Sequence, residues 1–405
     1  MWNVAWVSRR WRAIALGTPT LWSNIHISYE AWRERLITTQ LERSRDALLS
    51  ITIDLDFELP KWTQEDHFRD FSQYLERVMA LLRGQLYRWR SLDVAINCYT
   101  ENGQPSSYDK KYYHIVLRPL RKATAPALQS LRIIRAGRRG DESIFRGGTP
   151  SLSTVALFGT VDIGLPNFLS VTFLVLHETG TMLLETDFHR ILASCPCLTH
   201  LSLIGVPVHA PSTAHVLPVL ELPAVVSLSL SALVSDDATY PWTYIMRRRY
   251  EFDYLSMPNL HTLYLTVSPI ETFPEPCFSP ARPIDPAQLH DPNYFGNPID
   301  YGVHGILSFF PSIKRLSVDS YSLFHVLIRN VNASHVLCPQ LRTLIWTSGD
   351  GYWPESCDFP LHVARRRKAD GHPLAEISIP HEFYERMDAD VLEQLGDIVK
   401  LGISD

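Results

Sequence analysis

The sequence predicts an α/β fold, an irregular solenoid in which parallel strands line one face and helices and loops lie outside. Three observations indicate it. The pattern apolar-x-x-apolar-x-apolar recurs ten times along the 405 residues, a proline lies two residues before seven of the copies, and helix-compatible segments separate several of them. The apolar side chains of one copy cannot be buried by that copy alone. In a stack, each copy covers the apolar side chains of its neighbours. The chain is therefore expected to be a repeat protein.

The ten copies are expected to form the strands, in chain order and parallel. In Leu-x-Leu both apolar side chains point to the same side of a strand, and the apolar residue three positions earlier turns in beside them. A proline just before a strand removes no hydrogen bond from the centre of the sheet. Seven copies follow a proline and three do not: Leu128–Ile133, Leu152–Leu157, Leu198–Leu203, Val225–Leu230, Leu260–Leu265, Ile313–Val318 and Leu341–Trp346, then Leu48–Ile53, Trp89–Val94 and Val171–Leu176.

The segments between strands predict return helices, because their apolar residues recur at three- and four-residue spacing. From residue 128 onward, successive copies begin 19 to 53 residues apart. Several of these intervals are near the roughly 20–29 residues of a leucine-rich repeat. The predicted architecture is therefore a leucine-rich-repeat-like horseshoe with parallel strands on its concave face and insertions in the longer gaps. The predicted helices cover residues 65–86, 111–122, 182–194, 303–310 and 323–330.

Residues 268–301 form the largest predicted insertion. This segment contains eight prolines, so neither a helix nor a strand is expected to persist through it. It also carries four aromatic residues, Phe273, Phe278, Tyr294 and Phe295, more than a plain linker needs. Two interpretations remain open: a loop that grips a target or covers the concave face, and an excursion without a role.

Composition and charge exclude several functional classes. The net charge of −5 and the pI near 6.3 are opposite to the basic surface that nucleic-acid binding needs. No run of about 18 apolar residues predicts a membrane span, and residues 1–12 do not resemble a secretory signal. We expect a cytoplasmic or nuclear protein with six free thiols and no membrane partner. The basic runs at residues 247–249 and 365–368 are either an import signal, a patch for an acidic partner, or solvated helix faces.

Catalytic and metal-binding motifs were searched for and not found. The sequence has no phosphate-binding GxxxxGK[ST] or GxGxxG, no GxSxG nucleophile elbow and no HExxH pair. Cys195 and Cys197 are one residue apart, which is not the spacing of a zinc-binding pair. We therefore expect no enzymatic activity, no cofactor and no metal site.

The first fifty residues carry a second informative pattern. Residues 7–15 predict an amphipathic helix that ends near Gly17, followed by an extended Pro19-Thr20-Leu21-Trp22 segment that leads into a strand. Taken alone, this pattern places Trp11, Ile14 and Trp22 in the core.

The order of these motifs resembles the second half of the F-box in the large fungal F-box protein family. There, a Val-x-x-x-Trp-Arg-x-Ile-Ala helix leads into Pro-x-Leu-Trp, as at residues 7–15 and 19–22 of this chain, and irregular Pro-x-Leu-x-x-Leu-x-Leu repeats follow. The resemblance implies the substrate adaptor of a cullin–RING (SCF-type) ubiquitin ligase. Its F-box would dock on a Skp-type adaptor subunit through Val7, Trp11 and Trp22. Since the Leu-Pro-x-Glu half of the motif does not precede Met1, we expect residues 1–25 to be an F-box remnant that docks weakly, and residues 26–405 to be the solenoid.

Target recognition is expected on the strand face. The residues that flank and separate the last two apolar positions of a copy point away from the core, and several of them are large and apolar. The expected anchors for an unidentified target protein are Phe158, Phe173, His177, His200 and Tyr264. Two alternatives stay open. A loop or the C-terminal tail could cover this face, and the chain could be a non-catalytic scaffold without a ligase connection.

Overall fold

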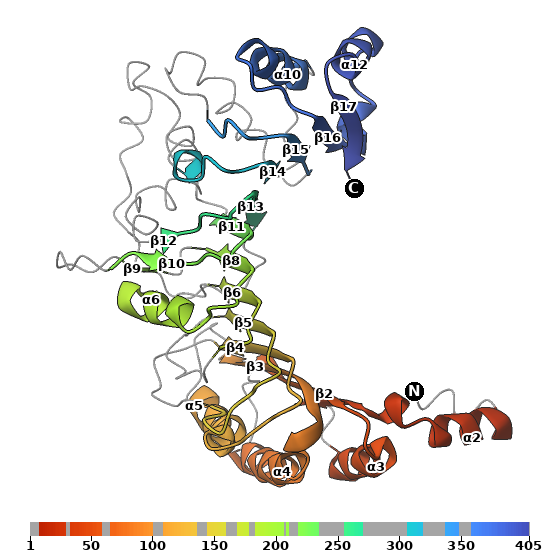
Figure 1. Cartoon of the computed structure of the whole chain (residues 1–405). Helices are drawn as coiled ribbons and strands as arrows, with labels where there is room; N and C mark the ends of the chain where they lie inside the picture. The colour runs from red at the N-terminus through yellow and green to blue at the C-terminus, as the bar shows by residue number, and fades with distance from the viewer. Residues whose placement is uncertain are drawn as a thin grey trace. The chain divides into compact units, whose positions relative to one another are not determined.

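The computed structural model describes the chain in thirteen stretches that fall into two compact units (Figure 1). Unit 1 comprises Met1–Cys197 and Pro274–Cys277, and unit 2 comprises Leu198–Phe273 and Phe278–Asp405. Each unit is a mixed α/β structure built on parallel strands. The described residues are 8–29, 33–58, 65–99, 108–135, 144–158, 168–177, 183–205, 208–209, 218–234, 255–269, 306–318, 337–347 and 358–404.

In unit 1, six parallel strands follow one another in chain order. Their register aligns the copies of the repeat pattern. Ile51 lies opposite Leu92 and Leu92 opposite Leu131, and the same row continues through the later strands. All members of this row are buried, so the strands share one continuous core face. The strands are β1 Asn24–Ser28, β2 Leu49–Glu58, β3 Trp89–Tyr99, β4 Ser130–Arg135, β5 Thr154–Phe158 and β6 Phe173–His177.

Unit 2 repeats this construction with seven parallel strands in chain order. Leu201 lies opposite Leu228, and Leu228 opposite Leu263. The strands are β8 His200–Ile204, β11 Ser227–Val234, β13 Thr262–Pro269, β14 Arg315–Val318, β15 Thr343–Trp346, β16 Glu376–Pro380 and β17 Lys400–Ser404. The remaining strands have two residues each: β7 Leu183–Leu184, β9 Val208–His209, β10 Leu220–Glu221 and β12 Leu255–Ser256, of which β10 pairs with β12.

All ten predicted copies contribute strands, and the neighbouring strands within each unit pair in parallel. The structure adds three copies to them. Trp22-x-x-Ile25-x-Ile27 leads into β1, where a strand but no repeat copy was expected. Leu374-x-x-Ile377-x-Ile379 leads into β16, and Ile398-x-x-Leu401-x-Ile403 leads into β17. The β16 copy has its proline one residue before the pattern instead of two, and the β17 copy has none. The pattern was present at both ends but departed from its usual lead-in.

The proline that announces a copy lies in a turn, which gives a more specific reason for its position than the one expected. At Pro126 the N–H of Leu128 donates to the carbonyl of Ala125, which places the proline second in a four-residue turn. The same bond closes the turns at Pro150, Pro223, Pro258, Pro311 and Pro339. Proline suits this position because its ring fixes φ near −65°.

A second backbone device joins one copy to the next. The carbonyl just before a strand accepts two N–H groups from the following copy, as when Thr199 accepts from Val226 and Ser227. Val226 in turn accepts from His261 and Thr262. The same pair of hydrogen bonds to one carbonyl recurs at Gln129, Ser153, His261, Lys314 and Arg342. Each copy is thereby held to the next before the strand begins.

The helices partly match the prediction. The segment 65–86 contains α4 Glu65–Arg83, the segment 111–122 contains most of α5 Tyr108–Val116 with a 3-10 turn η3 Arg118–Leu120, and the segment 182–194 contains β7 and α6 Glu185–Ala193. Residues 306–309 form one helical turn, and 323–330 lie outside the described residues. The other helices are α2 Arg9–Gly17, α3 Glu34–Ser44, α10 Phe359–Ala369, α11 His381–Tyr384 and α12 Ala389–Gly396, with 3-10 turns η1 Pro19–Trp22 and η2 Leu86–Arg88.

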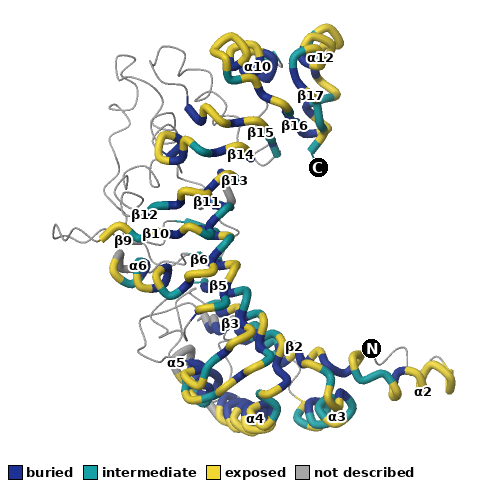
Figure 2. Tube along the Cα trace, viewed as in Figure 1, coloured by how far each residue is buried: buried dark blue, intermediate teal, exposed yellow. Residues whose placement is uncertain are grey.

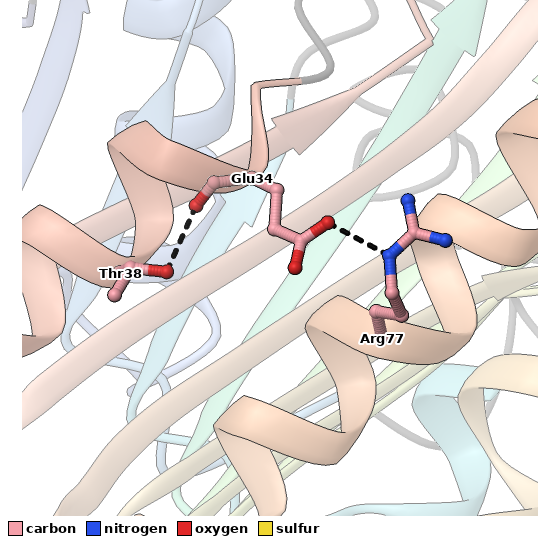
Figure 3. Close-up of polar contacts among 3 residues, drawn as sticks. All are labelled: Glu34, Thr38 and Arg77. Carbon is pink, nitrogen blue, oxygen red and sulfur yellow. Dashed lines mark hydrogen bonds and ion pairs between the residues drawn. The ribbon is translucent and has the colours of Figure 1, made fainter.

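Helix α4 shows why these segments fold as helices in unit 1. Its buried residues recur every three to four positions, which gives one apolar stripe: Phe68, Phe71, Tyr74, Leu75, Val78, Met79 and Leu82. On its solvent side Arg77 donates to the carboxylate of Glu34 in α3 at 2.8 Å, while the Glu34 carbonyl accepts from Thr38 Oγ1 at 3.1 Å (Figure 3).

The structure differs from the prediction at two boundaries and in the conformation of one segment. The boundary placed at residue 25 falls inside β1, and β13 extends to Pro269, so the predicted insertion begins within a strand. The rest of that insertion lies in residues 270–305, which are outside the described residues. The prediction that Pro19–Trp22 is extended was wrong, since it forms a 3-10 turn. Among the described helices none is long and apolar enough to cross a membrane.

Candidate functional site

The strand face of unit 1 carries three rows of side chains that point away from the core. The register of β3 to β6 aligns Asp93 with Arg132, and it aligns Ile134 with Phe158 and His177. These outward positions are half-buried or exposed, whereas the positions between them are buried. The face is thus accessible along four neighbouring strands of this unit.

Four of these residues form a connected chain across the four strands. Arg132 Nη1 donates to Asp93 Oδ2 at 3.0 Å, and its guanidinium carbon lies 5.1 Å from the ring centre of Phe158. The rings of Phe158 and His177 are 5.0 Å apart. A cation held by both a carboxylate and an aromatic face is fixed in position. The structure therefore brings two of the predicted anchors, Phe158 and His177, into contact and holds Arg132 against them.

Burial strongly shifts the titration of His177. Burial lowers the pKa of its imidazole from 6.5 to about 4, so the ring is neutral at pH 7. Within the ranges that the structure describes, its buried Nδ1 has no hydrogen-bond partner. A neutral imidazole packed on an aromatic ring makes this end of β6 an apolar surface.

The other predicted anchors lie apart from this cluster. Phe173 opens β6 and is 39% exposed. In unit 2, His200 is exposed and its Nδ1 lies 2.8 Å from Thr199 Oγ1, while Tyr264 is half-buried between the outward serines of its neighbouring strands, Ser229 and Ser317. The unit 2 face is therefore richer in hydroxyl groups.

Sequence reasoning missed Asp93 and Arg132. Each lies between the last two apolar residues of its copy, so an alignment of the copies would have placed them side by side. Opposite charges directly across neighbouring strands are a recognisable signal of this kind. The copies were read separately, and this signal was overlooked.

The second candidate surface is helix α2. Ser8 caps it by accepting from the Trp11 N–H at 3.2 Å, and Trp22 Nε1 donates to the Ala15 carbonyl at 2.6 Å. Trp22 is buried, as expected, and Arg43 of α3 lies over its ring at 4.4 Å. The helix is thereby fixed to the first strand of unit 1.

The prediction that Trp11 and Ile14 are core residues was wrong. Trp11 is 51% exposed and Ile14 46% exposed, and Figure 2 shows α2 almost entirely as exposed. Leu16 and Leu21 are exposed as well, and Ala15 is the one buried residue of the helix. Amphipathy revealed an apolar face but not that this face lacks a cover. Val7, the remaining predicted docking residue, lies outside the described residues.

A comparison within unit 1 shows how unusual this exposure is. The segment α2–η1–β1 is built like α4–η2–β3, which lies 67 residues later. Trp89 Nε1 donates to the Leu82 carbonyl, seven residues earlier, just as Trp22 donates to the carbonyl of Ala15. The counterpart of Trp11 is then Val78, which is fully buried. The position that Trp11 occupies in α2 is therefore completely buried at its equivalent in α4.

In the described stretches no group of three or more His, Cys, Asp or Glu residues could hold a metal ion. Burial raises the pKa of Cys195 and of Cys338 to about 12, so neither buried thiol is a ready nucleophile. Both surfaces can bind by apolar contact and by charge.

No protein-family model matches the chain. A search of curated proteins also gave no match.

Proposed function

We propose that this chain is a protein-recognition subunit with a leucine-rich-repeat-like solenoid, and that it works as the substrate adaptor of an SCF-type ubiquitin ligase. The parallel strands, aligned in chain order and linked by one repeated turn, support the repeat architecture. The order of motifs in the first fifty residues supports the ligase connection, because it resembles that of fungal F-box proteins.

The observation that carries the proposal is the open apolar side of α2. Large apolar residues gather at protein interfaces, and tryptophan is enriched among the residues that contribute most to affinity. Trp11 and Ile14 lie one turn apart on the same helix face, and the bond from Trp22 holds that helix in place. A fixed helix with an uncovered tryptophan is suited to dock on a Skp-type adaptor.

The strand face is the proposed site for the target. Its support is the cluster around Phe158, where the rings and the guanidinium are already in contact before any partner binds. Pre-formed contacts reduce the ordering that binding requires. Phe173, at the start of the neighbouring strand, would provide the exposed apolar anchor.

Adaptor binding is tested by capture of a purified Skp-type adaptor on the immobilised chain. The assay uses the chain as printed and a version preceded by the Leu-Pro-x-Glu half of a related F-box, which we expect to bind more tightly. Trp11→Ser should weaken capture of either version at least tenfold, the typical loss at a dominant interface residue. Leu169→Ser is the matched control, because Leu169 is 62% exposed in the same unit and outside α2. Equal capture by both variants would remove α2 from the interface.

A specific observation favours a second candidate, a non-catalytic scaffold. Because α2–η1–β1 repeats the geometry of α4–η2–β3, the first helix is also suited to be an ordinary first repeat. The same assay separates the two candidates. If neither version of the chain captures the adaptor, the ligase role fails and the scaffold role stands.

A further inference from the structure

The charges near α2 are segregated from those of the rest of the chain. The protein carries a net charge of −5, yet its first 29 residues contain no aspartate or glutamate. Arg9, Arg10 and Arg12 all lie in this segment, and all three are exposed. The helix that carries the open apolar face is therefore also a local concentration of positive charge.

These arginines lie where a helix does not favour them. The amino end of a helix carries a partial positive charge, so acidic residues stabilise the first turn and basic residues oppose it. The first turn of α2 has no acidic residue. Among the described residues, neither Arg9 nor Arg10 forms an ion pair with a carboxylate. Their placement is unfavourable for the helix alone, which directs attention to a binding role.

The charge borders the apolar face. Arg10 precedes Ile14 by four residues, so the two side chains are neighbours on the helix surface, and Trp11 precedes Ile14 by three on the same apolar face. A partner that covers Trp11 and Ile14 would therefore also meet the guanidinium of Arg10. Such a partner gains most if it presents carboxylates at that border, because opposite charges around an apolar centre speed and orient association.

We propose that α2 binds an apolar groove with an acidic rim on a protein partner, with Trp11 and Ile14 entering the groove and Arg9 and Arg10 pairing with the rim. This inference rests on the proposed function, since it describes the chemistry of the adaptor surface that α2 would meet. A protein fits better than a membrane. The helix has nine residues, and its buried Ala15 faces Trp22, so little apolar area is left to enter a bilayer.

The test is a charge reversal, Arg9→Glu/Arg10→Glu, with a Skp-type adaptor as the probe. Glutamate in the first turn should strengthen α2, so the variant keeps the helix while it reverses the charge. We expect capture to fall at least about tenfold, and capture by the unaltered chain to weaken clearly between 50 and 300 mM salt, as for other steered interfaces. The control Arg315→Glu/Arg342→Glu makes the same change in net charge at two exposed arginines of unit 2 and should leave capture within about twofold.

Each outcome decides the proposal. Capture that is insensitive to both the reversal and the salt overturns the acidic rim and leaves the adaptor function in place. No capture by either version of the chain overturns both. A third arm uses vesicles that contain phosphatidylserine. If the reversal abolishes vesicle binding but not adaptor capture, the arginines serve a membrane surface and the acidic rim on the protein partner is wrong.

Discussion

At the scale of single residues, burial separates side chains that the pattern treats alike. Leu201 in β8 and Ile403 in β17 both belong to copies of the repeat, but Leu201 is 1% exposed and Ile403 52% exposed. The pattern gives the direction of a side chain, and the neighbours decide whether it is covered. Stability should therefore depend on the position of a copy within its unit.

Leu201→Ala should lower the free energy of unfolding by roughly 2–5 kcal/mol, because it leaves a cavity beside Leu228. Chemical denaturation followed by circular dichroism would measure the loss. Ile403→Ala is the control and should cost less than about 1 kcal/mol, since half of that side chain is already in solvent. Equal losses for the two variants would contradict the burial described.

His177 should make stability depend on pH in acid. Its pKa is about 4 in the folded chain and near 6.5 when unfolded, so between these values the unfolded chain binds more protons. The contribution of His177 to the free energy of unfolding should be constant above pH 7 and should fall as the pH drops from 6.5 toward 4. At pH 5 we expect a loss of about 1 kcal/mol, after allowance for partial solvent exposure. Denaturation midpoints at pH 7.5 and 5 for the wild type and for His177→Phe would test this, and an identical drop in both would exclude His177 as the cause.

At the scale of elements, two arginines secure α3 and contribute very differently. Arg77 of α4 pairs with Glu34 on the surface, with side chains 54% and 40% exposed. Arg88 is buried in η2, and it donates to Ser44 Oγ at 3.0 Å and to the carbonyls of Arg45 and Leu41 at the end of α3. Water screens the first contact and not the second, so the buried arginine should dominate.

A double-mutant cycle on Glu34→Gln and Arg77→Met should give a coupling energy of about 0.2–1 kcal/mol, the usual range for an exposed pair. The measurement is urea denaturation of the wild type, both single variants and the double variant. A coupling above about 2 kcal/mol would show that this pair does more than an exposed pair can, and would make it a main link between α3 and α4.

Arg88→Met should cost about 3 kcal/mol, because it removes the donors that satisfy buried carbonyls at the end of α3. Arg83→Met, at an exposed arginine of the preceding helix, is the control and should cost less than about 0.5 kcal/mol. If both variants melt at the temperature of the wild type, the carbonyls of α3 must be satisfied by other donors.

At the scale of the whole molecule, each unit should lose its structure gradually from its ends. In unit 2 each pairing joins sequential strands of the main ladder, so stability is expected to be a sum over neighbours. Amide hydrogen exchange read by mass spectrometry should show the strongest protection in β11 and β13 and the weakest in β17. Uniform protection from β8 to β17 would mean that the unit unfolds in one cooperative step.

The sequence predicted the strands better than the surfaces, for a physical reason. A strand of this fold depends on three apolar residues within six positions, so copies such as Leu260–Leu265 could be recognised locally. The β17 copy, Ile398-x-x-Leu401-x-Ile403, was overlooked although three other copies without a proline were recognised. The environment of Trp11 depends on which helix lies opposite, and the contact of Arg132 with Phe158 depends on the register between strands. Neither can be predicted from the residues of a single copy. The expected horseshoe and its partners remain predictions.

The ladder of unit 2 also determines how the chain would respond to force. If Ser404 is pulled away from the sheet, the load falls first on the five register positions that join β17 to β16 and on the bond from Ser404 Oγ to the Trp346 carbonyl of β15. Strands removed in this way detach in sequence, each at a small force, and each released strand adds its length to the tether. An unfolding machine that pulls from this end would therefore meet a series of low barriers in place of a single high one, and could stop between them with the remaining strands intact.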